Sequence, residues 1–263
     1  MSDIGEVDSK AVERALRRLD RYDRESRFLI KRSEDYDVLE EVFDKPTLMT
    51  LHRMMNSHVL NYLNGVVSAG KEARVYWGVR DDGSNVAVKI YLTVTAEFRR
   101  RLPYIVGDPR FRSVKHDIRS LVNLWARKEY RNLATAGEAG VPCPKPLAVE
   151  KNVLVMEFIG EDGRSAPLLS EVDVTKRDYR SVIASIKRLY QGARLVHADL
   201  SEYNIFKHHG RMILFDFSSA VDLAHPHAEE FLIRDVNNIN HFFIKRDIET
   251  VPLDDVLKQV KEK

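Results

Sequence analysis

The sequence has little of what a secreted or membrane protein requires. Its single cysteine, Cys143, excludes an intrachain disulfide and is typical of a reducing compartment. No run approaches the roughly 18 apolar residues of a membrane span, and the N-terminus lacks the basic start and apolar stretch of a signal peptide. We therefore expect a cytoplasmic protein that has no membrane partner.

A large excess of one charge is absent as well. The 263 residues include 42 Lys and Arg against 40 Asp and Glu, a formal net charge of +2. The chain as a whole is therefore not a polycation, and contact with nucleic acid would need a local basic patch. A hydrophobic content of 44% allows a large core in one domain or in two lobes.

The first third of the chain predicts helix and then a small antiparallel sheet. Residues 1–46 are dense in charge and predict a solvated helical extension, which could instead dock a partner. Residues 47–63 have helical apolar spacing. Strand-forming sequence begins at Val66, and two further strands are predicted at 74–79 and 85–91, joined by a hairpin turn of sequence Asp-Asp-Gly-Ser.

A short loop of small residues, Ser68 to Ala73, precedes the second predicted strand. It contains one glycine, Gly70, where nucleotide-binding loops of the Gly-x-Gly-x-x-Gly type contain three. Such a loop can bring backbone N–H groups close to phosphates. An ordinary β-turn is the alternative.

Lys89 lies among the apolar residues of the third predicted strand, in Val-Ala-Val-Lys, close to the Val-Ala-Ile-Lys of kinase sheets. It either extends to solvent or points into a cleft, where a desolvated ammonium needs a carboxylate partner. Residues 115–139 predict a helix with Glu129 on its apolar stripe. We expect Glu129 to pair with Lys89, the alternative being a surface pair with Lys128 or Arg131.

An insert at about 93–114 precedes that helix and is basic. Residues 95–131 carry ten Lys and Arg against four acids, and aromatic residues are interspersed among them. Such a segment suits contact with RNA, although a solvated insertion has the same composition. The candidate RNA contacts are Arg99, Arg100, Arg101, Arg110 and Arg112.

Further along the chain, a buried strand is predicted at 153–156. It runs into residues 157–160, Glu-Phe-Ile-Gly, which indicates a hinge between lobes whose backbone could hydrogen-bond an adenine edge. Helical apolar spacing follows at 179–190, 226–243 and 253–260.

The strongest motif is the stretch from His197 to Asn204, His-Ala-Asp-Leu-Ser-Glu-Tyr-Asn. It places Asp199 five residues before Asn204, and Asp216 follows at the end of an apolar run. Kinases need this arrangement, because one Asp accepts the proton of the substrate hydroxyl while an Asn and a second Asp hold magnesium. We expect His197 to pack the loop against the strand before Asp216 and not to catalyse.

Lys89, Glu129, the hinge, Asp199, Asn204 and Asp216 follow the order of the protein-kinase fold. Over about residues 47–245 the sequence resembles the RIO family of atypical serine/threonine protein kinases. Ser68 to Ala73 resembles the phosphate loop of that family, and 195–204 resembles its catalytic loop. His-Ala-Asp, together with 226–232, resembles the Rio-one branch, and we expect an archaeal member.

The resemblance implies an α+β, bilobal protein-kinase-like fold. It has a small antiparallel sheet in the N-lobe and a mainly helical, truncated C-lobe. We expect a charged extension at 1–46, an N-lobe at 47–158 that contains the insert and the helix with Glu129, and a C-lobe at 159–263.

The resemblance also implies the roles of single residues. Asp199 would be the catalytic base, Asn204 and Asp216 would bind Mg²⁺ or Mn²⁺, and Asp216 could form an aspartyl-phosphate. ATP would be the substrate, bound by Ser68, Lys71, Lys89, Glu129, Glu157 and Ile159. Family members autophosphorylate, act as ATPases and work on the precursor of the small ribosomal subunit.

Three features depart from a conventional protein kinase. Ser201 stands where a Lys is usual, Asp216-Phe217-Ser218 replaces Asp-Phe-Gly, and no Ala-Pro-Glu motif follows. Residues 217–220 also differ from the Val-Ser-Gln-Ser associated with this branch. Two other functions stay open, a small-molecule kinase of the aminoglycoside or choline type and a nucleotide-gated binding module.

Overall fold

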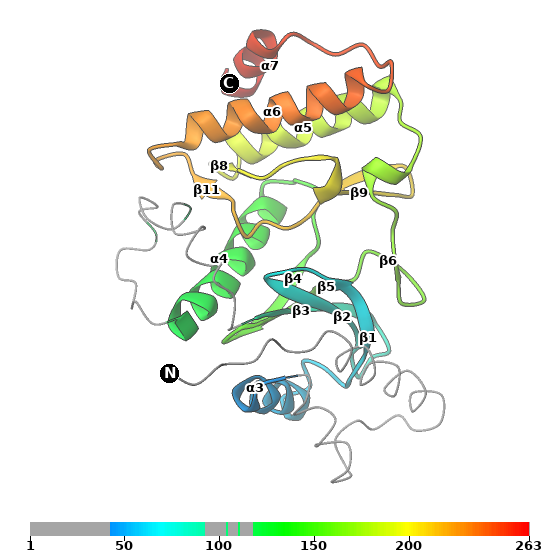
Figure 1. Cartoon of the computed structure of the whole chain (residues 1–263), viewed down its shortest axis with the longest axis vertical. Helices are drawn as coiled ribbons and strands as arrows, with labels where there is room; N and C mark the ends of the chain where they lie inside the picture. Colours follow the sequence, from blue (N-terminus) through cyan, green and yellow to red (C-terminus); the bar gives the residue numbers. More distant parts are fainter. Residues whose placement is uncertain (1–42, 93–103, 105–109, 111–117, 263) are drawn as a thin grey trace, which may run out of the picture.

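The computed structural model describes residues 43–92, 104, 110 and 118–262, which form two lobes (Figure 1). Residues 1–42 of the predicted extension lie outside the described residues, as does the predicted insert apart from Tyr104 and Arg110. No helix of the described part is long and apolar enough to cross a membrane.

The N-lobe is built on a five-stranded antiparallel sheet with the order β1-β2-β3-β5-β4. The two predicted hairpin strands are found at nearly the expected positions. The strands are β1 Tyr62–Ala69, β2 Ala73–Val79, β3 Asn85–Tyr91, β4 Pro146–Glu150 and β5 Val153–Glu157.

Alternation along β3 separates the two faces of this sheet. Val86, Val88 and Ile90 pack in the hydrophobic cluster that includes the helix α3 (Lys45–Asn56). Side chains of successive strand residues point to opposite faces. Lys89 therefore faces the other side, where the helix α4 (Ile118–Glu138) lies against β4 and β5.

The first helix is shorter than the predicted range of 47–63. Asp44 caps α3 by accepting from Thr47 N, and the helix ends at Asn56. Ser57 forms the cap and His58 has a φ of 60°, a left-handed conformation that an α-helix cannot continue through. The last two residues of the predicted helical range, 62 and 63, therefore belong to β1, which begins at Tyr62.

The C-lobe is mainly helical, as predicted. Its helices are α5 Lys176–Gln191, α6 Ala228–Ile244 and α7 Leu253–Lys261. In Figure 1 they lie above the sheet, with α5 beside α6 and α7 at the top. Tyr179, Val182, Val236, Phe243 and Val256 are buried between them.

Three two-stranded sheets, two of them hairpins, and two short 3-10 turns lie between these helices and the N-lobe sheet (Figure 1). They are β6 Gly160–Glu161 with β7 Arg164–Ser165, β8 Leu195–Val196 with β11 Val221–Asp222, β9 Ile205–His208 with β10 Arg211–Leu214, η2 Leu169–Glu171 and η3 Glu202–Asn204. These short elements carry the residues of the predicted catalytic loop. The α+β, kinase-like architecture predicted from the sequence is confirmed.

Candidate active site

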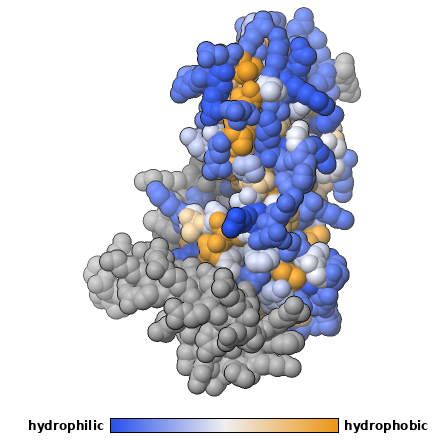
Figure 2. Space-filling view, turned by 90° about the vertical axis from the view of Figure 1, so that its right-hand side faces the viewer, coloured by the Kyte–Doolittle hydropathy of each residue, from blue (hydrophilic) through white to orange (hydrophobic). Residues whose placement is uncertain are grey.

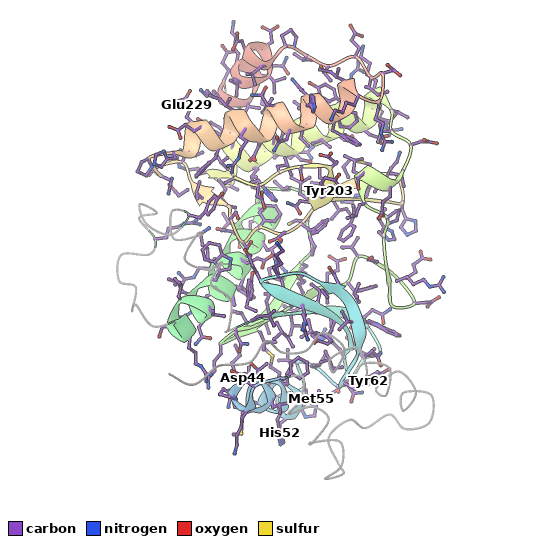
Figure 3. All side chains as sticks on the ribbon, viewed as in Figure 1. Asp44, His52, Met55, Tyr62, Tyr203 and Glu229 are labelled. Atoms are coloured by element: carbon purple, nitrogen blue, oxygen red, sulfur yellow. The ribbon has the colours of Figure 1, made fainter. Side chains whose placement is uncertain are left out.

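A cavity of about 920 Å³ lies between the two lobes. Residues from both lobes line it, and Tyr203, labelled in Figure 3, projects from the C-lobe side. All but one of the predicted site residues line this cavity, namely Ser68, Lys71, Lys89, Glu129, Glu157, Ile159, Asn204 and Asp216. Asp199 is exposed and is not part of its lining.

A triad of charges lies at the back of the cavity, with Lys89 and Glu129 buried and Asp216 partly exposed. Lys89 Nζ is 2.9 Å from the Glu129 carboxylate and 3.0 Å from Asp216 Oδ1. The Tyr91 hydroxyl also donates to Glu129, which is 0% exposed. One ammonium thus links strand β3, helix α4 and the segment after β10, as the alternation along β3 and the apolar stripe of α4 require.

The electrostatics of this triad keep Lys89 charged. Burial opposes the charged form, but the carboxylates of Asp216 and Glu129 outweigh that cost and raise the pKa of Lys89. Burial raises the pKa of Glu129, and Lys89 opposes that rise. A buried cation of this kind can attract the phosphates of a nucleotide that enters the cavity.

Asp216 is held in an uncommon backbone conformation. Its φ is 58°, in the left-handed region that costs a non-glycine residue free energy. The Ser218 hydroxyl donates to Asp216 Oδ1 over 2.6 Å. The serine that replaces the glycine of Asp-Phe-Gly therefore orients the carboxylate.

Two polar residues of α4 bind the backbone that follows Asp216. Lys128 is 0% exposed, and its Nζ donates to the carbonyl oxygens of Ser218 (2.9 Å) and Ala220 (2.6 Å). Asn132 Nδ2 donates to the carbonyl oxygens of Phe217 and Ala220, each over 2.9 Å. Since Glu129 lies on the same helix, α4 fixes both the Lys89 ion pair and the segment that carries Asp216.

The catalytic-loop backbone is fixed by a residue of α6. Asp235 is buried and accepts from the backbone N–H groups of Ala198 (2.8 Å) and Leu200 (2.9 Å), on either side of Asp199. Ala198 has a φ of 64°, and Arg234 donates to its carbonyl oxygen. Burial raises the pKa of Asp235 to about 7, against the two N–H bonds that favour its ionised form.

Asn204 and Asp216 offer the oxygen ligands that magnesium prefers. Asn204 Nδ2 donates to the Asp199 carbonyl oxygen over 2.7 Å. Only the NH₂ group can make that bond, so the amide oxygen points elsewhere and is available as a metal ligand. The two residues therefore supply oxygen ligands of the kind that a magnesium ion would need.

His197 packs between the catalytic loop and the Asp216 segment. Its Nε2 lies 3.0 Å from the Phe215 carbonyl oxygen, and its ring is 4.8 Å from the ring of Phe217. Burial lowers the pKa of His197 to about 4. The imidazole is therefore neutral at pH 7.

Sequence reasoning missed Asp235, Lys128 and Asn132. Glu129 could be found because it is a carboxylate on the apolar stripe of a helix. The same is true of Asp235, which lies three residues after Leu232 on the apolar stripe of α6. Sequence reasoning predicts Lys128 only as an alternative surface partner of Glu129. In the structure it is buried and points to the backbone beyond Asp216.

Comparison with known proteins places this arrangement among kinases. A family model for the RIO domain matches residues 74–256. The chain is 39% identical to the human serine/threonine-protein kinase RIO1 over 89% of its length, but it spans only 42% of that protein. It is 41% identical to the RIO-type serine/threonine-protein kinase Rio1 of Haloferax volcanii, covering 90% of this chain and 82% of the relative.

A solved structure shares the fold. The Rio2 kinase of Chaetomium thermophilum, crystallised as an ADP/Mg²⁺-phosphoaspartate complex, superposes with a TM-score of 0.62 at 24% identity. The match covers 92% of this chain and 74% of that one.

Proposed function

The chain belongs to the RIO family of kinases, and from that membership we propose that it is an ATP- and magnesium-dependent serine/threonine protein kinase with ATPase activity. The observation that carries the proposal is the pairing of Lys89 with both Glu129 and Asp216 at the back of a cavity between two lobes. A phosphoryl-transfer enzyme needs a fixed cation beside the metal ligand there, because its catalysis is mainly positioning and charge stabilisation.

The hinge supplies complementary groups for adenine. The Ile159 carbonyl oxygen already accepts from Ala166 N, and Glu157 N already donates to the Lys145 carbonyl oxygen, both over 2.8 Å. The Glu157 carbonyl and the Ile159 N–H would then serve as an acceptor and a donor for the adenine edge. The loop with Ser68 and Lys71 would cover the phosphates, supplementing Lys89 now that Ser201 replaces the usual lysine.

In this proposal Asp199 accepts the proton of a serine or threonine hydroxyl as its oxygen bonds to the γ-phosphorus and ADP leaves. Asn204 and Asp216 would hold the magnesium, which would neutralise charge on the phosphates. In the ATPase reaction the Asp216 carboxylate would attack the γ-phosphorus, release ADP and be restored when water hydrolyses the acyl-phosphate.

The partners are part of the same proposal. Family resemblance supports a precursor of the small ribosomal subunit as the cytoplasmic target, with rRNA contact through the basic insert. Of the candidate contacts, only Arg110 is described, and its Nη1 donates to Asn132 Oδ1 over 2.8 Å. Asn132 also binds the Asp216 segment, so that arginine connects the insert with the site.

Labelling with γ-³²P-ATP and magnesium tests the activity. Asp199→Ala should keep ADP affinity but lose hydroxyl phosphorylation by several orders of magnitude, as expected for removal of a main catalytic group. Turnover within tenfold of wild type would overturn the role of Asp199. Glu202→Ala, a nearby carboxylate outside the cavity lining, is the matched control.

The chemistry of the label separates the alternatives. Label that hydroxylamine removes is an acyl-phosphate and supports the ATPase cycle, whereas stable label is phosphoserine or phosphothreonine. Label transferred to an aminoglycoside or choline would favour a small-molecule kinase. Nucleotide binding without any turnover would identify a nucleotide-gated binding module.

A further inference from the structure

Two hairpins present a cluster of metal-binding side chains outside the nucleotide cavity. Glu161 lies at the end of β6, and His208 and His209 lie at the end of β9 and in the turn after it. One ligand atom from each residue lies within 4.8 Å of the others. Among the described residues, this is the one such group of three or more His, Cys, Asp and Glu.

The turns of both hairpins explain how the three side chains meet. Asp162 and Gly163 have φ values of 48° and 75°, and His209 and Gly210 have 48° and 72°. Positive φ at both central residues is the type I′ geometry that fits the twist of two-residue hairpins. In the second turn, the rings of His208 and His209 have a centroid distance of 3.9 Å.

The donor spacing is close to that of a bound transition metal. Zinc binds His nitrogen and carboxylate oxygen at about 2.0–2.2 Å, so neighbouring donors of a tetrahedral site lie roughly 3.4 Å apart. His209 Nε2 and Glu161 Oε1 are already 3.4 Å apart. One ligand atom of His208 lies within 4.8 Å of the other two, so His208 is the donor whose side chain would move closer to complete the set.

The two hairpins are held together by the backbone, so the donors do not depend on a metal to approach one another. Lys207 N donates to the Pro167 carbonyl oxygen over 3.0 Å, and Leu168 forms a bridge with Phe206. In Figure 1, β6 and β9 lie on the right-hand side, which faces the viewer in Figure 2 and is mainly hydrophilic. A cavity of about 760 Å³ borders the cluster and leaves room for a further ligand such as water.

We propose that Glu161, His208 and His209 form a site for a borderline transition-metal ion such as Zn²⁺, distinct from the magnesium ligands of the nucleotide cavity. Imidazole nitrogen suits zinc, nickel and copper, whereas magnesium prefers oxygen ligands. The bound ion joins the segment after the hinge to the hairpin that connects Asn204 with Asp216. It therefore restrains the C-lobe wall of the nucleotide cavity without touching the nucleotide.

A zinc titration in competition with a fluorescent chelator tests the site. The full chain is used without a polyhistidine tag and with magnesium in excess. Wild type should bind one equivalent of zinc and gain roughly 5 °C in Tm when zinc reaches 100 times its Kd. His208→Ala and His209→Ala should each weaken zinc binding by about 100-fold, since loss of an outer-shell partner alone costs roughly 10–100-fold.

The control is His58→Ala. His58 and Asp81 form an exposed pair with an Nδ1–Oδ2 distance of 2.5 Å, and within the described part of the chain they belong to no group of three donors. This variant should bind zinc like wild type, and all three variants should keep wild-type ATP turnover and circular dichroism. Absence of zinc binding by wild type, wild-type zinc affinity in His208→Ala or His209→Ala, or displacement of zinc by magnesium would each overturn the proposal.

Discussion

Replacing Lys128 by Met tests how α4 controls the position of Asp216. Methionine keeps the length and apolar packing of the side chain beside Trp125, whose ring centroid is 5.3 Å from Lys128 Nζ. It removes the ammonium that binds the carbonyl oxygens of Ser218 and Ala220. Asn132 still donates to Ala220, so the Ser218 carbonyl loses its α4 donor.

The expected cost follows from these bonds. A hydrogen bond to a charged group contributes about 1.5–3 kcal/mol, and two are lost. Together they amount to about 3–6 kcal/mol, and the variant recovers part of this because it no longer buries a charge. We expect a net loss of about 2–3 kcal/mol in the free energy of unfolding, or roughly 5–10 °C in Tm for a chain of this size.

The functional consequence concerns metal binding. Once the backbone of 217–220 loosens, the left-handed conformation of Asp216 is less well enforced, and the carboxylate spends less time in the metal-binding geometry. We expect affinity for ADP at limiting magnesium to fall about tenfold, equivalent to roughly 1.4 kcal/mol. Isothermal titration measures the affinity, and urea unfolding measures the stability.

Arg127→Met is the matched control, because Arg127 is the preceding residue of α4, carries the same charge and is exposed. It should change neither quantity. If Lys128→Met loses stability but keeps its ADP and magnesium affinity, Lys128 only fills space and the proposed coupling is wrong. If Lys128→Met loses neither stability nor ADP affinity, the hydrogen bonds from Lys128 to the carbonyl oxygens of Ser218 and Ala220 contribute to neither.

Three further predictions concern single groups. His197 has a folded pKa of about 4, below its ordinary 6.5, so the stability it contributes is present above pH 6.5 and is lost as the pH falls towards 4. The stability gap between wild type and His197→Gln should therefore shrink by about 3 kcal/mol from pH 7 to pH 4 in urea unfolding, and a constant gap would contradict the shift. Asp235→Asn presents an NH₂ group to one of the N–H donors beside Asp199, so turnover should fall by about 10–100-fold while ADP affinity holds; reduced ADP affinity with unchanged turnover would refute this. Burial raises the pKa of Cys143 to about 12, so iodoacetamide at pH 8 should label it at least about 100-fold more slowly than a free thiol, and rapid labelling of the folded protein would show that the thiol is accessible.

The sequence was most informative where a residue conflicts with its own surroundings. Lys89 in an apolar strand and Glu129 on an apolar helix stripe each need a partner of opposite charge, and burial makes that need strong. Pairing the two required no knowledge of the tertiary structure. The alternation along β3 and the period of α4 then decided which faces would meet.

Backbone conformations were beyond such reasoning. The left-handed φ of Ala198 and of Asp216 is imposed by Asp235 and by the contacts from α4, since neither residue favours it. His58 also has a left-handed φ, and α3 ends before it, earlier than the apolar spacing predicts. Local sequence sets a preference, and tertiary contacts from distant segments override it.

Lys128 shows most clearly what could not be predicted from the sequence. A lysine beside a glutamate on a helix is usually exposed, because lysine is almost never fully buried unless it is paired. Its acceptors are carbonyl oxygens about ninety residues away, and every residue carries a carbonyl, so the sequence contains no mark of this pairing.

What the sequence does contain is spacing, since Trp125, Lys128 and Asn132 are three and four residues apart and share one face of the helix. A buried aromatic residue on that face implies that its polar neighbours must find partners in whatever segment packs there. The segment is the one that carries Asp216, and unchanged nucleotide affinity in Lys128→Met would mean that such buried polar residues serve packing alone.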